Sequence, residues 1–144
     1  VLWDHALDPK TNGLIKLKKS KDIKKVILCS GKVYFDLIEA REKLKRDDVI
    51  FYRIEQLYPF PVKSLVKELK PYAKNAKFYW CQEEPKNMGA WFSARDYIQW
   101  TLDNIKANNN KISYIGRSPD ASPATGYAKW HISQQEEIIK KVFK

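Results

Sequence analysis

Four short apolar runs, separated by longer stretches of helical pattern, constrain the fold of this chain more than any other feature of its sequence. The runs are KKVILCSG, DVIFYRIE, KFYWCQ and ISYIG, at residues 24–31, 48–55, 77–82 and 112–116. They are too short for helices and too continuous for half-exposed strands, as is typical of strands buried on both faces. Strand and helix in alternation predict a three-layer α/β fold, with a mostly parallel sheet and helices on both of its faces.

The stretches between the runs have the periodicity of helices that cover such a sheet. In KVYFDLIEAREKLKR, apolar residues recur at helical spacing at Val33, Leu37, Ala40 and Leu44. VKSLVKELKPYAK is predicted to be helical up to the residue before Pro71, because proline disfavours the helical conformation of its predecessor. MGAWFSARDYIQWTLDNIKA repeats the helical pattern at greater length. In HISQQEEIIKKVFK, Ser133 and Glu136 have the spacing of a capping box, which predicts the start of a last helix.

The length of 144 residues suits a single domain. We expect the α/β domain over residues 23–144, after a lead-in at residues 1–22 in which LIKLK could add an edge strand. The chain opens VLWDH without an initiator methionine, so we expect it to be part of a longer polypeptide. It has neither an apolar stretch of the roughly 20 residues that a membrane span needs nor a signal-peptide pattern, which indicates an intracellular protein without a membrane partner.

The net charge of +10 raises the question of a polyanionic partner. Lysines are spread through every segment, and the dense run IKLKKSKDIKK has no aromatic residues among them. Nucleic-acid modules instead group arginine and aromatic side chains on one surface. We therefore interpret the lysines as a solvated exterior, and we do not expect nucleic acid to be a partner.

The cysteines and histidines do not form a recognisable reactive or metal-binding pattern. Cys29 and Cys81 lie in apolar runs without a second ligand at metal-binding spacing, so we predict buried, reduced thiols. His131 could act as a base, but the sequence offers no nucleophile or orienting acid beside it. A role in anchoring the preceding loop is the simpler interpretation.

The loops at the two edges of the predicted sheet differ in character. The helix-to-strand connections, KRDD, KNAK and NIKANNNK, are ordinary polar turns. The strand-to-helix connections are CSGK, EQLYPFP, CQEEPKNMGAW and GRSPDASPATGYAKW, which are rich in proline, glycine, aromatic and charged residues. Because ligands and partners of such folds bind at the carboxyl edge, the sequence points to that edge as the functional one.

Glu83 and Glu84 leave the third apolar run together and allow three interpretations. They could form an acid/base pair, although adjacent residues of a strand point in different directions. They could bind a divalent cation, but no third ligand follows at a suitable spacing. We favour salt-bridge or capping acceptors at a contact surface, to which Trp91, Phe92 and Tyr58 would add apolar area.

The GRSPDASPATG loop is a second candidate site, for a regulatory anion. Its small hydroxyl residues and glycine allow main-chain amides to approach a phosphate, and a helix follows. The residues that we single out are Arg117, Ser118, Ser122, Thr125 and Lys129. The loop matches no standard phosphate-binding motif, so a rigid, proline-pinned connection is the competing interpretation.

The motifs CSGKVY, RIEQLYPFP, WCQEEPKNMGAW and GRSPDASPATGY followed by His131 resemble, in this order, the C-terminal domain of 2-oxoglutarate dehydrogenase. The resemblance covers the chain from about residue 26 to its end and implies the third domain of a transketolase-type fold. It implies a parent enzyme that uses thiamine diphosphate and Mg²⁺ to decarboxylate 2-oxoglutarate, and then passes the succinyl group to the lipoyl arm of the second component. The implied partners are the other domains of the same chain, a homodimer partner and the dihydrolipoyl succinyltransferase component.

The resemblance assigns no catalytic, cofactor-binding or metal-binding residue to this stretch. The Gly-Asp-Gly pattern that holds the metal-diphosphate in the family is absent, and neither His5 nor His131 matches the family's active-site histidines. We therefore expect an isolated domain without activity, and Glu83 and Glu84 as interdomain acceptors. The compartment implied is the cytoplasm in a bacterium or the mitochondrial matrix in a eukaryote. Two alternatives remain open at this point: the same domain of a 2-oxoadipate dehydrogenase, and a free-standing basic module that binds an anion or nucleotide.

Overall fold

The computed structural model describes residues 1–8, 14–120 and 128–144, with side chains of α4 from residue 132 onwards. In chain order, its main elements are β1 (Lys25–Cys29), α1 (Val33–Leu44), β2 (Val49–Arg53), α2 (Val62–Leu69), β3 (Lys77–Pro85), α3 (Trp91–Asn104), β4 (Ser113–Arg117) and α4 (Ala128–Phe143). Short 3-10 turns lie at His5–Leu7, Ser20–Asp22 and Lys70–Tyr72. The strands form one sheet in the order β2-β1-β3-β4, and all three pairings are parallel. The prediction of an α/β fold with a parallel sheet is confirmed.

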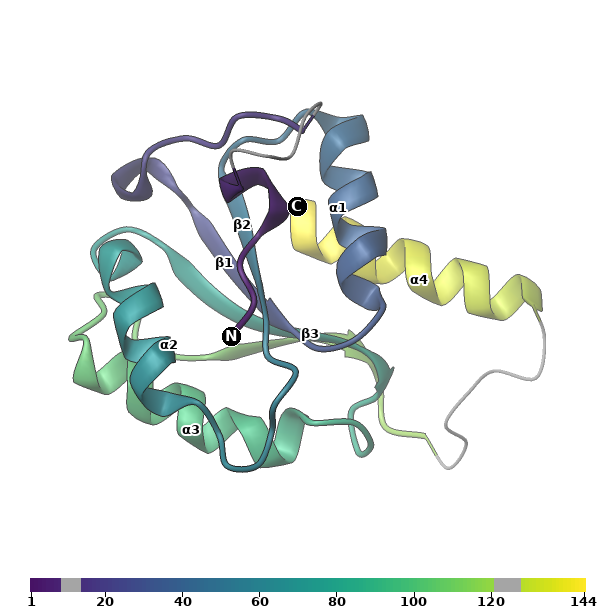
Figure 1. Ribbon diagram of the computed structural model, residues 1–144. Coiled ribbons are helices and arrows are strands. Elements are labelled where there is room, and N and C mark those ends of the chain that lie inside the picture. The colour runs from purple at the N-terminus through teal and green to yellow at the C-terminus, as the bar shows by residue number, and fades with distance from the viewer. Residues whose placement is uncertain (9–13, 121–127) are drawn as a thin grey trace.

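The sheet lies between two helical layers, with α1 and α4 on one face and α2 and α3 on the other (Figure 1). Alternate residues of β1 face opposite layers: Val26 and Leu28 pack with α2 and α3, whereas Ile27 and Cys29 pack with α1 and α4. This alternation is the two-residue period of a strand. Both sides of the strand are therefore buried, which explains why its sequence is continuously apolar.

Two expectations about helices need correction. On α1, Val33 and Leu37 are buried as predicted, but Leu44 is 55% exposed, and Tyr34 and Arg41 lie in the interior instead. The helix α4 begins at Ala128, so Ser133 lies inside it and does not cap it. The capping-box pattern was misleading because the helical conformation extends upstream of it. The helix α2 ends at Leu69, which agrees with the prediction that Pro71 ends it.

LIKLK does not form the edge strand that the sequence allowed, and the contact with the β2 edge is made by residues nearer the N-terminus. Residues 14–18 form no strand, because their main chain bonds elsewhere: Ile15 N donates to both carboxylate oxygens of Glu42 at 3.0 Å, and Lys18 N donates to Asp47 O. The antiparallel bridge to β2 is made by Leu2 and Arg53. The expected location of the edge strand was therefore wrong.

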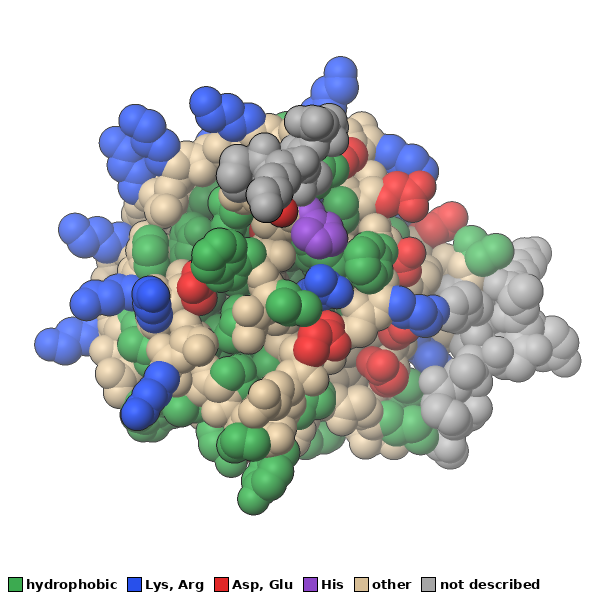
Figure 2. Space-filling view, in the orientation of Figure 1, with side chains coloured by type: hydrophobic (Ala, Val, Ile, Leu, Met, Phe, Trp, Pro, Cys, Tyr) green, Lys and Arg blue, Asp and Glu red, His purple; other side chains and the backbone are tan. Residues whose placement is uncertain are grey.

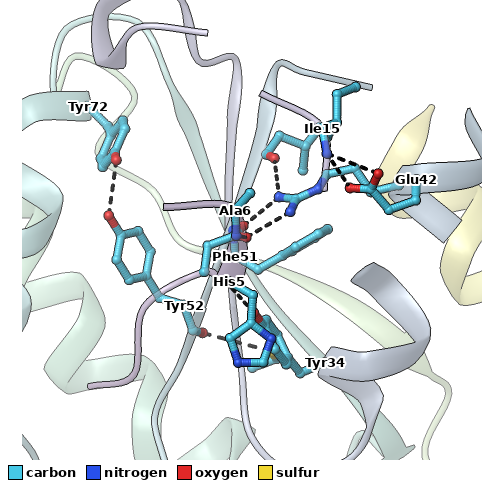
Figure 3. Close-up of polar contacts among 12 residues, drawn as sticks. His5, Ala6, Ile15, Tyr34, Glu42, Phe51, Tyr52 and Tyr72 are labelled. Atoms are coloured by element: carbon cyan, nitrogen blue, oxygen red, sulfur yellow. Dashed lines mark hydrogen bonds and ion pairs between the residues drawn. The ribbon is translucent and has the colours of Figure 1, made fainter. Parts of the chain in front are cut away.

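Residues 2–6 are fixed to the domain by a buried carboxylate. Asp4 forms a two-pronged ion pair with Arg41, with Oδ1 2.7 Å from Nη2, and both side chains are fully buried. Asp4 also accepts from the main-chain N–H groups of Phe51 at 2.9 Å and Ala6 at 2.9 Å. Figure 3 shows this junction, in which His5 N also donates to the hydroxyl of Tyr34 at 2.8 Å.

Both cysteines are buried and unpaired, as predicted. Burial raises the pKa of the Cys81 thiol to about 12 and also raises the pKa of Cys29. Because the thiolate is the reactive form, we expect neither thiol to react measurably with a thiol-specific disulfide reagent in the folded chain at pH 8. Both should react within minutes in concentrated urea. The reaction is measured by absorbance, and rapid reaction of either thiol in the native chain would contradict this burial.

Candidate interdomain contact surface

At one edge of the sheet, the carboxyl ends of β1, β2, β3 and β4 lie together with the loops that follow them. Glu83 and Glu84 lie within the last residues of β3 and not in a loop, because β3 continues to Pro85. A register shift between Cys81 and Pro85 marks this part of the strand. The strand is therefore longer than the apolar run that predicted it.

The two glutamates point to different surroundings, as expected for neighbours in a strand. The carboxylate of Glu83 lies 3.4 Å from Lys32 Nζ and accepts from Gln135 Nε2 at 3.3 Å. Glu83 is thus engaged within the domain, between the start of α1 and α4. The side chain of Glu84 has no hydrogen bond or ion pair with another described residue. Of the pair, Glu84 offers the acceptor that a neighbouring domain could use.

Gln82 organises the turn between β3 and α3. Its side-chain oxygen accepts from Trp80 Nε1 at 2.9 Å and from the main-chain N–H of Trp91 at 3.1 Å. Its amide nitrogen donates to the carbonyl oxygens of Pro85 at 2.9 Å and Met88 at 2.8 Å. One buried side chain therefore closes the turn, a role that its position in the sequence did not indicate.

Of the aromatic residues expected at a contact, one is in the interior. Trp91 is only 7% exposed and packs against the ring of Tyr114, with centroids 5.3 Å apart. Phe92 is half exposed and Tyr58 is 91% exposed. The peptide bond between Tyr58 and Pro59 is cis. Trp91 therefore stabilises this domain, while Phe92 and Tyr58 are available to a neighbour.

A group of exposed apolar side chains lies beside this edge and was not anticipated. Leu2, Trp3 and Leu7 belong to the N-terminal segment, and Phe35 belongs to the first turn of α1; Trp3 is 60% and Phe35 54% exposed. The guanidinium of Arg53 joins the two parts, since it lies 5.2 Å from the ring centroid of Phe35 and Arg53 pairs with Leu2. We call these four apolar residues the N-terminal patch. Figure 2 shows hydrophobic side chains gathered around the histidine on this face.

The candidate anion site is described only in part. Ser122 and Thr125 lie outside the described residues, as does the side chain of Lys129. Arg117 is buried at the end of β4, with its guanidinium 3.7 Å from the carboxylate of Asp120, and Ser118 is exposed. The small depression beside them, about 150 Å³, is also lined by Glu137. Arg117 is thus already engaged with an acid, and the anion site as a whole stays a prediction.

Within the described ranges, no three His, Cys, Asp or Glu side chains are placed to hold a metal ion. His5 contacts the edge of the Tyr34 ring, with centroids 5.3 Å apart, and the side chain of His131 lies outside the description. No described helix is long and apolar enough to cross a membrane. We derive no catalytic step or cofactor contact from this chain.

The fold and this edge define a small α/β domain of the transketolase type. A solved structure entitled "Split gene transketolase, inactive beta4 tetramer" matches with a TM-score of 0.52 and 10% identity, over 96% of this chain and 44% of that one. The family of 2-oxoglutarate dehydrogenase C-terminal domains matches residues 3–143. The chain therefore belongs to that family, and the match begins well before the region in which the sequence motifs are recognisable.

Individual relatives agree with this assignment. The 2-oxoglutarate dehydrogenase E1 components of Brucella anthropi, Brucella ovis and Brucella canis are each 52% identical over 140 residues. The match covers 97% of this chain but only 14% of each relative. Their name favours neither the 2-oxoadipate alternative nor a free-standing module.

Proposed function

We propose that this chain is the C-terminal structural and contact domain of a longer 2-oxoglutarate dehydrogenase. The parent would decarboxylate 2-oxoglutarate with thiamine diphosphate and Mg²⁺, and would transfer the succinyl group to the lipoyl arm of dihydrolipoyl succinyltransferase. It would act as a homodimer, in the cytoplasm of a bacterium or the mitochondrial matrix of a eukaryote. The identity to E1 components that are about seven times longer supports this proposal.

The observation that carries the domain's own role is the N-terminal patch beside the carboxyl edge. Three large apolar side chains are exposed on an N-terminal segment that is pinned by the buried pair of Asp4 and Arg41, and Phe35 adds a fourth from the first turn of α1. A contiguous exposed apolar patch on a rigid support is typical of a contact surface. We propose that the preceding domains of the parent cover this patch, together with Tyr58, Phe92 and Glu84.

The family resemblance carries the assignment of the cofactor. Because the Gly-Asp-Gly stretch that holds the metal-diphosphate in the family does not occur in this sequence, we propose that other domains of the parent hold thiamine diphosphate and Mg²⁺. The domain would contribute by holding those domains together. We accordingly expect the isolated chain to show no decarboxylation of 2-oxoglutarate when supplied with the cofactor and the metal.

The test is substitution of exposed patch residues in the full-length polypeptide. We expect the double variant Trp3→Ser and Phe35→Ser to dissociate into subunits at a protein concentration at least tenfold higher than the wild type. The physical reason is the loss of apolar area that is buried only in the assembled enzyme. Analytical ultracentrifugation gives the dissociation concentration, and circular dichroism of the variant checks that the domain remains folded.

The matched control is Leu44→Ser, since Leu44 has nearly the same exposure as Phe35 and lies on the same helix, near the amino edge. This control should behave as the wild type does. If the patch variant and the control assembled equally well, the patch would not contribute to the contact between subunits.

A further inference from the structure

The amino edge of the sheet, opposite the proposed contact edge, holds a depression lined largely by lysines. Its volume is about 470 Å³, and five lysines line it: Lys24, Lys25, Lys77, Lys141 and Lys144. Lys25 and Lys77 are the first residues of β1 and β3 and are paired in register, so their Cα atoms lie one strand spacing apart, about 4.8 Å. The last turn of α4 brings Lys141 beside them. The fold thus gathers lysines that are far apart in the sequence.

Acidic side chains do not balance this charge. No Asp or Glu lines the depression, and within the described residues none of its five lysines forms an ion pair. Asp48, whose charge acts on Lys25, is already paired with Arg46 at 3.0 Å. Concave surfaces lined by charge of one sign concentrate ligands of the opposite sign.

Lys25 is held at the floor of the depression. Its Nζ donates to the main-chain oxygens of Val142 at 3.0 Å and Lys144 at 3.1 Å, and it lies 5.5 Å from the ring centroid of Tyr79. Burial and then the positive charge of Arg46 lower the pKa of Lys25, with further lowering by Lys77 and Lys144 and an opposing effect of Asp48. The positive charges therefore lie close enough to repel one another, a repulsion that a bound anion would relieve.

A second depression continues the basic edge toward β4. It has a volume of about 350 Å³, shares Lys77 and Tyr79 with the first, and adds Lys111 and a run of asparagines at residues 108–110. It too has no acidic side chain in its lining. The two depressions together extend across the amino ends of three neighbouring strands.

We propose that this lysine-lined edge binds a compact polyphosphate anion. Lysine ammonium groups are compact point charges that can bind phosphate, and no arginine lines either depression to supply two-pronged recognition of a single group, so the lining favours a ligand with high charge density. The volume falls within the range of small-ligand sites, roughly 300–1,000 Å³. One face of the Tyr79 ring, the aromatic side chain that lines the first depression, is covered by Lys25 Nζ at 5.5 Å from the ring centroid, which leaves less aromatic surface for a nucleobase. The site therefore recognises clustered phosphate charge and not the rest of the ligand.

The test is lysine footprinting on the full-length polypeptide, saturated with thiamine diphosphate so that the parent's cofactor site is filled. Acetylation rates are measured by mass spectrometry with and without 1 mM tripolyphosphate in low salt. We expect the acetylation of Lys77 and Lys141 to slow at least threefold, and ATP to protect as well as tripolyphosphate does. Lys63 and Lys67, exposed on α2, are the matched controls and should not change. Protection should be lost at high ionic strength, which screens exposed charges.

Four patterns of protection would overturn the proposal. The first is that tripolyphosphate gives no protection, and the second is that it protects the α2 lysines equally. The third is protection by ATP alone, which would indicate recognition of the base. The fourth is protection by polyglutamate alone, which would indicate an acidic polypeptide partner. Lysines that resist acetylation before any ligand is added would also overturn it, because the edge would then be covered by another domain.

A Lys77→Gln and Lys141→Gln double variant should bind tripolyphosphate at least tenfold more weakly in calorimetric titration, while Lys63→Gln and Lys67→Gln should not. The inference does not depend on the proposed function.

Discussion

The replacement Arg41→Met is expected to lower the free energy of unfolding of this chain by about 3–5 kcal/mol. The substitution leaves the carboxylate of Asp4 buried without its charge partner, while the long apolar side chain of methionine fills most of the volume. Arg41 also donates to the main-chain oxygen of Val49 at 3.1 Å, and that bond is lost as well. Urea unfolding followed by circular dichroism gives the difference.

Two further variants separate the ion pair from general packing. In Arg41→Met combined with Asp4→Leu, part of the loss should be recovered, because neither charge is then buried alone. Recovery should be incomplete, since Asp4 also accepts from Phe51 N and Ala6 N. The exposed pair of Glu39 and Lys43 on the same helix is the control, and Lys43→Ala should cost less than about 0.5 kcal/mol. A loss below 1 kcal/mol for Arg41→Met would show that the N-terminal segment is not anchored through Asp4.

Gln82→Leu is expected to lower the free energy of unfolding by about 2–6 kcal/mol, because two buried donors, Trp80 Nε1 and Trp91 N, lose their acceptor at roughly 1–3 kcal/mol each. The turn at residues 86–90 loses two bonds to its carbonyl oxygens at the same time. We therefore expect the amides of this turn to exchange hydrogen at least tenfold faster in the variant. Hydrogen exchange by mass spectrometry measures this directly.

Gln56→Ala is the matched control, because Gln56 is exposed and makes a single bond, to Pro59 O at 3.1 Å. It should change stability by no more than about 0.5 kcal/mol. Unchanged exchange at residues 86–90 in the Gln82 variant would mean that other contacts hold the turn.

The strands of this fold were predictable because burial on both faces requires a continuous run of apolar residues in the sequence. Each of the four apolar runs overlaps a strand, although β3 and β4 continue past the ends of their runs, and helices lie between them. The error at Ser133 has a local cause: a capping box can occur inside a helix whose start is fixed by residues further upstream. Glu84 and Tyr58 were also found from their position at the carboxyl edge, although their role stays a prediction.

Features that depend on tertiary contacts could not be read in advance. Arg41 has the helical spacing of a core position after Leu37, but its partner Asp4 is 37 residues away and no local pattern connects them. The exposure of Trp3 and Phe35 is likewise set by the way in which the N-terminal segment crosses the end of β2. The sequence predicts the lysines of the amino edge to be part of a solvated exterior, because only the folded chain brings Lys77 beside Lys141.

The claim that the N-terminal patch is covered in the parent enzyme is tested most directly by hydroxyl-radical footprinting, since radicals oxidise side chains in proportion to their contact with solvent. The oxidation rates of Trp3 and Phe35 are compared between the full-length polypeptide and the 144-residue chain, with Leu44 as the internal reference. We expect Trp3 and Phe35 to be oxidised at least threefold more slowly in the full-length polypeptide, and Leu44 at the same rate in both. Equal rates for Trp3 and Phe35 would contradict the role of this domain as a contact domain.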